Sequence, residues 1–435
     1  MTTVEFFDRT PIENIISSLT VVPDKIIFIG DEKTMNRYSS VYDNFIAHRG
    51  LSTVLDYKPI KKNDLQDIID VLSEIVKTEN DCVFDLTGGE DLVLVAMGIV
   101  YQKYKGNNIR MQRFNVLNGL VTDCDGDGQV VYEGKPNLTV EEQILLHGGK
   151  VRYEADGDGR TYPWDLSQEF MNDVRLMWAQ CKKNPGLWNS QINIVEIAAN
   201  MSGDEESLEV SVDKELLCKR LAAANIENKE LKYLLQYLEN NKLISCYVEK
   251  NGILTFYFKD LQVKKCLTTA GLVLEMIVLV TALTVTHKDK TPYYTDGING
   301  VSIDWDGEFH QRDDAKKDTE NEVDAILMKG LIPVFISCKN GQFKEDELYK
   351  LDAVANHFGG QYAKRIMIIS YWGKKSPNPA YFRKRAEDMG INLLEGVHKL
   401  TEKEFEKQIR SMINYTVKPE KNDAIACQAA GNVVN

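Results

Sequence analysis

The stretch NEVDAILMKGLIPVFISCKNG, residues 321–341, consists of two apolar runs that are separated by Met-Lys-Gly. Two such runs joined by a short turn with glycine predict a β-hairpin. Asp324 stands at the start of the first predicted strand, and Lys339 ends the second. Because side chains alternate between the two faces of a strand, Ser337 and Lys339 are expected on one face. The hairpin can therefore bring acidic, hydroxyl and basic side chains together.

A strongly apolar segment, GLVLEMIVLVTAL, precedes the hairpin and carries Glu275. It is shorter than the ~20 uninterrupted apolar residues of a membrane span, so we interpret it as a buried helix. A carboxylate in such a helix is costly unless it forms an ion pair or binds a metal. Glu275, Asp324 and Lys339 are therefore candidates for one shared site.

A site of this composition suits phosphodiester hydrolysis. Carboxylates and a backbone carbonyl can hold Mg²⁺ or Mn²⁺, which polarises a phosphate and activates water. A lysine can orient the nucleophile or offset the charge of the transition state. A second interpretation stays open, in which the three residues form a buried ion network that binds no metal.

Composition limits the class of protein. A chain of 435 residues predicts two or three domains, and 43% hydrophobic with 27% charged residues is typical of globular proteins. The net charge of −13 means that any nucleic acid must bind to a local basic patch, and the densest basic run lies within residues 364–385. The eight cysteines form no C-x-x-C pair, which disfavours zinc and favours a reduced, cytoplasmic protein.

The first third of the chain alternates between strand-like and helix-like segments. The runs KIIFIGD (25–31), STVLDY (52–57) and DCVFDLTGG (81–89) predict strands of a parallel, Rossmann-like sheet. Thr87, Gly88 and Gly89 lie between a strand and a helix, where free N–H groups favour a phosphate or another polar group. The absence of G-x-G-x-x-G disfavours NAD.

The middle of the chain contains two features with structural interpretations. DCDGDGQ at residues 123–129 imitates a calcium loop but has Gly134 where glutamate is needed, so a hairpin turn is favoured. Residues 165–188 predict one amphipathic helix. Residues 195–260 predict helices and then a hairpin with Asn251-Gly252 at its turn, as in a winged-helix-like module. Its many glutamates favour packing or dimerisation over DNA binding.

The order Glu, Asp, x-x-Lys on helix, strand and strand resembles the PD-(D/E)XK restriction-endonuclease superfamily. Residues 321–341, with the preceding apolar helix and LYKLDAVANHFGG after the lysine, are similar to CRISPR-associated nucleases with a preceding CARF (CRISPR-associated Rossmann fold) domain. VEFFDRTPIENI (4–15) and DLTGGEDLVLVAMG (85–98) are similar to the ligand-facing segments of CARF domains.

This resemblance implies an α/β protein with a Rossmann-like CARF domain (1–164) and a helical linker with a winged-helix-like module (165–265). A restriction-endonuclease-like α/β domain (266–416) and a flexible tail (417–435) follow. In this family, two CARF domains pair and share one cyclic oligoadenylate, most often the tetra-adenylate. The resemblance therefore implies a homodimer, with ligand-binding residues Thr10, Gly30, Thr87, Gly88, Gly89 and Asp91.

The same resemblance assigns roles in the nuclease domain. Glu275, Asp324, Ser337 and Lys339 become the catalytic residues, and Glu275, Asp324 and the Cys338 backbone carbonyl become the ligands of Mg²⁺ or Mn²⁺. Ser337 departs from the family, because an acidic residue usually stands two before the lysine, and serine is the poorer metal ligand.

The implied function is a metal-dependent nuclease of type III CRISPR antiviral defence that is activated by cyclic oligoadenylate and cleaves DNA, RNA or both. The alternative is a non-enzymatic regulator that senses a cyclic nucleotide and has a degenerate nuclease domain. Ser337 keeps this alternative open. Neither function involves a membrane.

Overall fold

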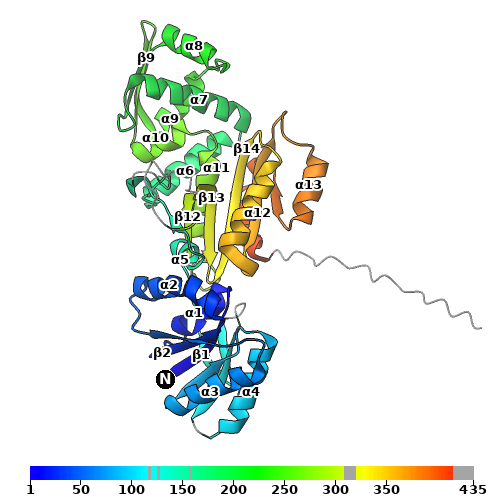
Figure 1. Cartoon of the computed structure of the whole chain (residues 1–435). Helices are drawn as coiled ribbons and strands as arrows, with labels where there is room; N and C mark the ends of the chain where they lie inside the picture. Colours follow the sequence, from blue (N-terminus) through cyan, green and yellow to red (C-terminus); the bar gives the residue numbers. More distant parts are fainter. Residues whose placement is uncertain (107, 116–118, 125–127, 157–158, 308–319, 415–435) are drawn as a thin grey trace, which may run out of the picture.

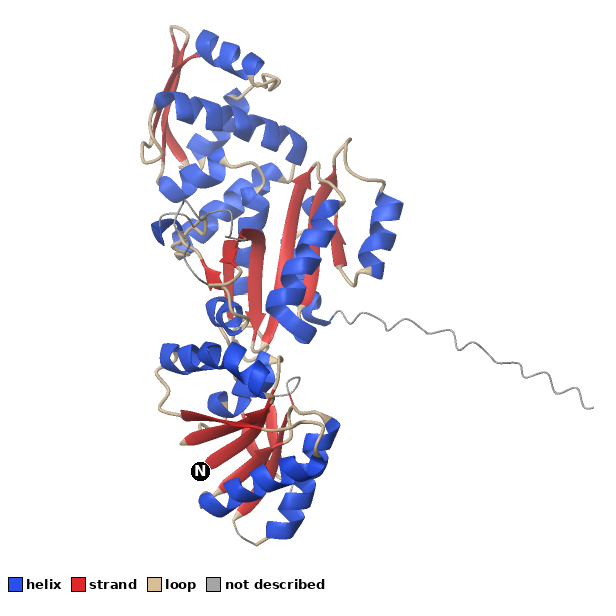
Figure 2. Cartoon of the chain, in the orientation of Figure 1, coloured by secondary structure: helices blue, strands red, loops and turns tan. Residues whose placement is uncertain are grey.

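The computed structural model describes residues 1–414 except 107, 116–118, 125–127, 157–158 and 308–319. Three sheets follow one another along an elongated molecule (Figure 1). The first holds the N-terminus, the second lies in the middle and the third, small sheet lies at the opposite end. Helices pack against all three sheets (Figure 2). No helix within these described ranges is long and apolar enough to cross a membrane.

The first sheet is the Rossmann-like sheet that the N-terminal pattern predicts. Its strands are β1 (Thr2–Phe7), β2 (Lys25–Gly30), β3 (Val54–Pro59), β4 (Cys82–Asp85), β5 (Ile109–Asn115), β6 (Leu120–Asp123) and β7 (Val130–Glu133). They lie in the order β3-β2-β1-β4-β5-β6-β7, and the pairs from β3 to β5 are parallel. β6 and β7 pair antiparallel, as expected for the strands of the hairpin predicted around residues 123–129, and residues 125–127 of its turn lie outside the described residues.

Helices bury both faces of this sheet. They are α1 (Pro11–Leu19), α2 (Glu32–His48), α3 (Leu65–Thr78) and α4 (Asp91–Tyr104). Phe28 packs in the cluster with residues of α1 and α2, whereas Ile27 and Ile29 pack with α3 and α4. Because neighbours on both faces exclude water, β2 is continuously apolar from Ile26 to Ile29 and shows no polar alternation there.

The prediction of one helix over residues 165–188 is wrong. Two helices, α6 (Gln168–Cys181) and α7 (Pro185–Ser202), occupy this region. The Asn184 side chain accepts the Leu187 N–H, and Pro185 takes the first position of α7. An N-cap followed by proline is a strong start signal, so a new helix begins there.

The third sheet contains the hairpin predicted near residue 251. Its elements are β9 (Glu209–Asp213), α8 (Lys214–Ala223), α9 (Lys232–Asn240), β10 (Ile244–Lys250) and β11 (Ile253–Phe258), followed by α10 (Leu261–Thr268). Asn251 and Gly252 have φ values of 55° and 79°. Positive φ at both central residues suits a type I′ turn, which explains the Asn-Gly pair. β9 adds a third strand that was not predicted.

The second sheet is mixed and contains the hairpin of residues 321–341. Its strands are β8 (Lys150–Val151), β12 (Asp296–Asp304), β13 (Glu320–Lys329), β14 (Ile332–Gly341), β15 (Lys364–Trp372) and β16 (Asn392–Glu395). The order is β16-β15-β14-β13-β12-β8, and β13 and β14 pair antiparallel, which confirms the predicted hairpin. β14, β15 and β16 are parallel.

Helices pack on the two faces of the second sheet. α11 (Leu272–Thr284) is the predicted buried helix and packs in one cluster with Leu327 of β13. α12 (Asp346–Gly359) packs with Phe335 of β14 in another cluster and continues into the 3₁₀ helix η3 (Gly360–Tyr362). α13 (Pro379–Asp388) and α14 (Glu402–Ser411) complete the domain.

The segment between the first two sheets contributes to the second one. α5 (Val140–Leu146) lies between α2 and α12, and β8 pairs with β12 through Val151 and Ile303. The Val140 N–H also donates to Asp296 Oδ2 at 2.7 Å. The two sheets are therefore joined by packed structure as well as by the chain.

Candidate active site

Asp324 lies inside β13, not at the start of the strand as predicted. The β13–β14 ladder ends at the Ala325–Ile336 pair, but β13 continues to pair with β12. Beyond the end of that ladder, the Asp324 carboxylate accepts the Cys338 backbone N–H at 2.5 Å. The Asp324 side chain thus accepts an N–H that a backbone carbonyl of β13 would accept if the ladder continued. This hydrogen bond fixes the Asp324 carboxylate beside the last pair of the ladder.

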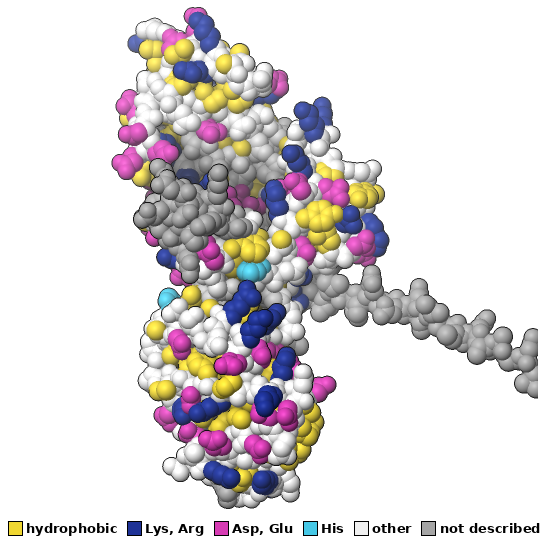
Figure 3. All heavy atoms as spheres, in the orientation of Figure 1, with side chains coloured by type: hydrophobic (Ala, Val, Ile, Leu, Met, Phe, Trp, Pro, Cys, Tyr) yellow, Lys and Arg dark blue, Asp and Glu magenta, His cyan; other side chains and the backbone are white. Residues whose placement is uncertain are grey.

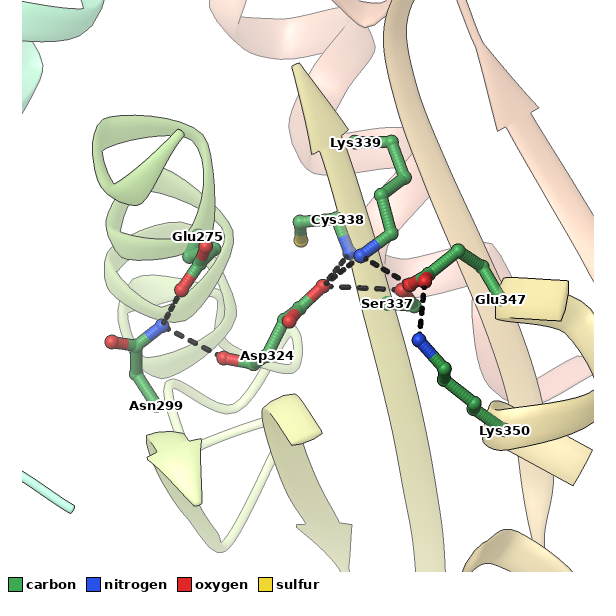
Figure 4. Close-up of polar contacts among 8 residues, drawn as sticks. All are labelled: Glu275, Asn299, Asp324, Ser337, Cys338, Lys339, Glu347 and Lys350. Carbon is green, nitrogen blue, oxygen red and sulfur yellow. Dashed lines mark hydrogen bonds and ion pairs between the residues drawn. The ribbon is translucent and has the colours of Figure 1, made fainter. Parts of the chain in front are cut away.

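Ser337 and Lys339 both reach the same oxygen of Asp324 (Figure 4). Ser337 Oγ donates to Asp324 Oδ2 at 3.1 Å, and Lys339 Nζ donates to it at 3.2 Å. Burial alone would lower the pKa of Lys339, but the charges of Asp324 and Glu347 outweigh burial and raise that pKa. Lys339 is therefore a firmly charged cation at neutral pH. The structure brings together the three side chains that the hairpin pattern singled out.

Glu275 lies in the first turn of α11 and is linked to Asp324 by Asn299 of β12. The Asn299 amide donates to Glu275 Oε2 at 3.3 Å and to the Asp324 backbone carbonyl at 2.8 Å. Burial and the negative charge of Asp324 raise the pKa of Glu275 to about 8. Two carboxylates that repel each other in this way would be stabilised by a cation between them.

A cavity of about 360 Å³ lies beside Asp324, Ser337 and Lys339, between β13, β14 and α12. Its lining includes Asp324, Lys339, Glu347 and Lys350. Glu347 Oε2 is 2.9 Å from Lys339 Nζ, and Glu347 Oε1 is 2.9 Å from Lys350 Nζ. The sequence interpretation missed Glu347 and Lys350. The sequence feature that could have indicated them is their position in the helix that follows the Ser-x-Lys strand.

The donor atoms fit a small divalent cation. Every hydrogen bond of the Asp324 side chain in the described structure goes to Oδ2, which leaves Oδ1 for a metal. Within the described ranges, no group of three or more His, Cys, Asp or Glu side chains is arranged to hold a metal. Mg²⁺ nevertheless binds through one or two carboxylates and keeps several waters. Glu275, Asp324 and the Cys338 carbonyl therefore remain a chemically suitable set.

The basic run within residues 364–385 is largely neutralised by acidic neighbours. On the face shown in Figure 3, basic and acidic side chains are interspersed over the surface. The ion pairs of this run include Arg365–Asp352 at 3.1 Å, Arg383–Glu395 at 2.8 Å, Lys384–Asp388 at 2.8 Å and Arg385–Glu345 at 3.7 Å. Lys350 is the additional cation that lines the cavity itself.

The predicted ligand-binding residues gather at the carboxyl ends of the parallel strands. Thr10 follows β1, Gly30 ends β2, and the Thr87–Gly89 turn precedes α4, which begins with Asp91. In the order β3-β2-β1-β4-β5, the direction of the connections reverses between β1 and β4. Open α/β sheets bind ligands at this position.

Close packing explains the glycines of this region. A Cβ on Gly88 would lie 2.7 Å from Glu13 Oε2, and a Cβ on Gly30 would lie 2.8 Å from the Phe7 carbonyl oxygen. Gly89 has a φ of 129°, which side chains rarely allow. The turn therefore needs glycine for its own conformation and for its contact with α1.

Comparison with known proteins identifies the architecture. No family model matches the chain, and no curated protein matches it significantly. Protein VC1899 from Vibrio cholerae superimposes with a TM-score of 0.70 and 18% identity, over 95% of this chain and 98% of that one. Can2 from Sulfobacillus thermosulfidooxidans, solved in complex with cyclic tetra-adenylate, superimposes with a TM-score of 0.61 and 14% identity, over 96% of this chain and 99% of that one. The chain has a Can2-like fold.

The Can2-like fold confirms two parts of the predicted architecture, an α/β protein and its parallel, Rossmann-like N-terminal sheet, and the second sheet of this fold is mixed. At identities of 14% and 18%, the similarity concerns the fold. The roles of individual residues therefore rest on the geometry of this chain.

The raised pKa of Glu275 predicts how stability depends on pH. Its folded pKa of about 8 exceeds the ordinary value of 4.5, so the unfolded chain releases this proton first as pH rises. Stability of the metal-free protein should therefore fall between about pH 4.5 and pH 8 through this group, and Glu275→Gln should flatten the slope. Denaturant unfolding of both proteins across this range tests the prediction.

Metal binding supplies the control for that measurement. A carboxylate must be ionised to bind a metal, so if Glu275 is a ligand as predicted, Mn²⁺ should raise the melting temperature more at about pH 8 than at about pH 5.5. Glu275→Gln should lose most of this increase, and Glu215→Gln, which changes an exposed acid on α8, should keep it. An unchanged Mn²⁺ effect in Glu275→Gln would contradict the assignment of Glu275 as a ligand.

Proposed function

We propose that this protein is a metal-dependent nuclease of type III CRISPR antiviral defence that is activated by cyclic oligoadenylate. It hydrolyses phosphodiester bonds in DNA, RNA or both. The observation that carries the proposal is the convergence of Lys339, Ser337 and the Cys338 N–H on one oxygen of Asp324 beside a cavity. Glu275 adds a second carboxylate to this group.

The residues of the site divide the chemistry among them. Glu275, Asp324 and the Cys338 carbonyl would hold Mg²⁺ or Mn²⁺, which when bound polarises the phosphate and makes water more acidic. Lys339 keeps its proton, orients the attacking water and offsets the charge that develops on the phosphate oxygens. Ser337 fixes the orientation of Asp324.

The Thr87–Gly89 turn supports a cyclic oligoadenylate as the activator. Its backbone precedes the N-terminus of α4, where N–H groups and the helix dipole favour phosphate. Can2 binds cyclic tetra-adenylate in its solved complex, which favours the tetra-adenylate here. We infer a homodimer that shares one ring through the residues Thr10, Gly30, Thr87, Gly88, Gly89 and Asp91 of each chain.

Glu13 provides a contact between the ligand turn and the nuclease half. Its Oε2 lies against Gly88, and its Oε1 accepts from Gln361 Nε2 at 3.3 Å and from Tyr362 OH at 3.5 Å. A ligand that moves the turn would disturb this contact and shift the population towards another arrangement of the two halves.

The alternative is a regulator that senses a cyclic nucleotide and does not cleave nucleic acid. Ser337 favours it, because a serine stands where the superfamily has an acidic metal ligand. In this case the third sheet and its helices would bind DNA, and the nuclease domain would be degenerate.

One assay separates the two functions. The purified protein is incubated with single- and double-stranded DNA and RNA, a panel of cyclic oligoadenylates, and Mg²⁺ or Mn²⁺. Cleavage that needs both metal and ligand supports the nuclease. Ligand binding without cleavage of any substrate supports the regulator.

Ser337→Ala should retain much of the cleavage activity, with a loss of no more than about threefold. The variant removes one hydrogen bond to Asp324 Oδ2, while the Cys338 N–H and Lys339 still hold that oxygen. The rate under saturating ligand and metal is the measurement. A loss as large as that of an Asp324 variant would make the Ser337 hydroxyl a ligand of the metal or substrate.

A further inference from the structure

Position 337 is a serine, and the second acidic side chain beside Lys339 comes from α12 instead. Ser337 gives its hydroxyl to Asp324, and the second carboxylate on Lys339 belongs to Glu347. We propose that Glu347 is a positioning residue for the proposed nuclease reaction, which holds the Lys339 ammonium over the cavity. This inference rests on the proposed function of Lys339.

Lys339 is held from two sides. Its Nζ lies 3.2 Å from Asp324 Oδ2 and 2.9 Å from Glu347 Oε2. The Lys339 and Glu347 side chains are only 19% and 21% exposed, so water competes weakly for this ion pair. A lysine has a long, flexible stem, and one carboxylate would leave the ammonium free to swing around it. Two carboxylates on different elements fix its place.

Glu347 is itself oriented. Lys350, one turn along α12, lies 2.9 Å from its other oxygen, Oε1. Glu347 also belongs to the first turn of α12, where the helix dipole favours a negative charge. Burial would raise the pKa of Glu347, but the hydrogen bonds from Lys350 and Lys339 outweigh burial and lower that pKa. Glu347 is therefore a fixed anion at neutral pH.

The contact predicts a specific pattern of kinetics. Glu347→Ala should lower kcat by about 10- to 100-fold, because a small displacement of a catalytic group has an effect of this size. KM for nucleic acid and the affinity for Mn²⁺ should stay unchanged. Asp346→Ala is the matched control, since it removes an exposed acid from the same turn of α12. Asp346 pairs only distantly with Lys350, at 4.0 Å. It should leave kcat unchanged.

A double-mutant cycle tests whether Glu347 acts through Lys339. In the Lys339→Ala background, Glu347→Ala should cause no further loss of activity, because the group that it positions is absent. A further loss equal to that in the parent protein would overturn the inference, and so would full activity of Glu347→Ala alone. Weaker Mn²⁺ binding by Glu347→Ala would overturn it as well, because Glu347 would then be a metal ligand.

A second readout does not depend on cleavage. Labelling of amines with acetic anhydride, followed by mass spectrometry, should modify Lys339 slowly in the parent protein and in Asp346→Ala, and several-fold faster in Glu347→Ala. An unchanged labelling rate of Lys339 in Glu347→Ala would overturn the inference that Glu347 holds Lys339. If the parent protein cleaves no substrate, the proposed function fails, while the labelling still decides whether Glu347 holds Lys339.

Discussion

Asp324→Asn should lower the rate of cleavage by at least ~10²-fold while the protein stays folded. Asparagine has the same size and can still accept the Cys338 N–H, so the end of the β13–β14 ladder should survive. It lacks the negative charge that holds Lys339 and that a metal needs. The measurement is the initial rate with saturating metal and ligand, and thermal melting shows whether the fold is kept.

Lys339→Ala should cause a loss of similar size, because no other described residue donates to the same Asp324 oxygen as a cation. Asp352→Asn is a suitable control. Asp352 lies on α12 and pairs with Arg365 at 3.1 Å, and it is not among the residues that line the cavity. Full activity of either purified site variant would reject the assignment of the active site.

Gly88→Glu should abolish activation by cyclic oligoadenylate and leave Mn²⁺ binding intact. The first side-chain carbon would already lie 2.7 Å from Glu13 Oε2, so the turn or Glu13 must move. The new carboxylate would also repel a phosphate at the N-terminus of α4. Calorimetry with the ligand and with Mn²⁺, and cleavage with and without ligand, give the three readouts.

Gln66→Glu provides a control with the same added charge on the exposed surface of α3, and it should respond to the ligand normally. In the parent protein, calorimetry should give one ring per two chains. One ring per chain, or equal cleavage with and without ligand, would contradict a shared activator even if the nuclease assignment held.

Local patterns predicted those parts of the structure that neighbours in sequence determine. The hairpin of residues 321–341 was predictable because its turn and its alternation are local, and so was the meeting of Ser337 and Lys339 with Asp324. The continuous apolar strands of the first sheet were predictable in the same way. The break between α6 and α7 was also encoded locally, by Asn184 and Pro185, but the amphipathic pattern on either side obscured it.

Other features depend on contacts between distant segments. The short strand β8 consists of two residues that pair with β12, and nothing within them indicates a partner so far along the chain. Asp324 was placed at a strand end because the extra pairing of β13 with β12 was not foreseen. Glu347 could not be assigned to Lys339 before the position of α12 over β14 was known.

The length of α12 has a mechanical consequence. Glu347 lies in its first turn, and its last residue leads directly into η3, where Gln361 and Tyr362 meet Glu13. A helix of 14 residues is about 21 Å long and behaves as a stiff rod. A tilt of about 5° around its η3 end would therefore carry the first turn by about 2 Å. A displacement of that size would break the 2.9 Å ion pair between Glu347 and Lys339, so a small rotation of α12 beside the N-terminal sheet would be enough to release the lysine at the other end of the helix.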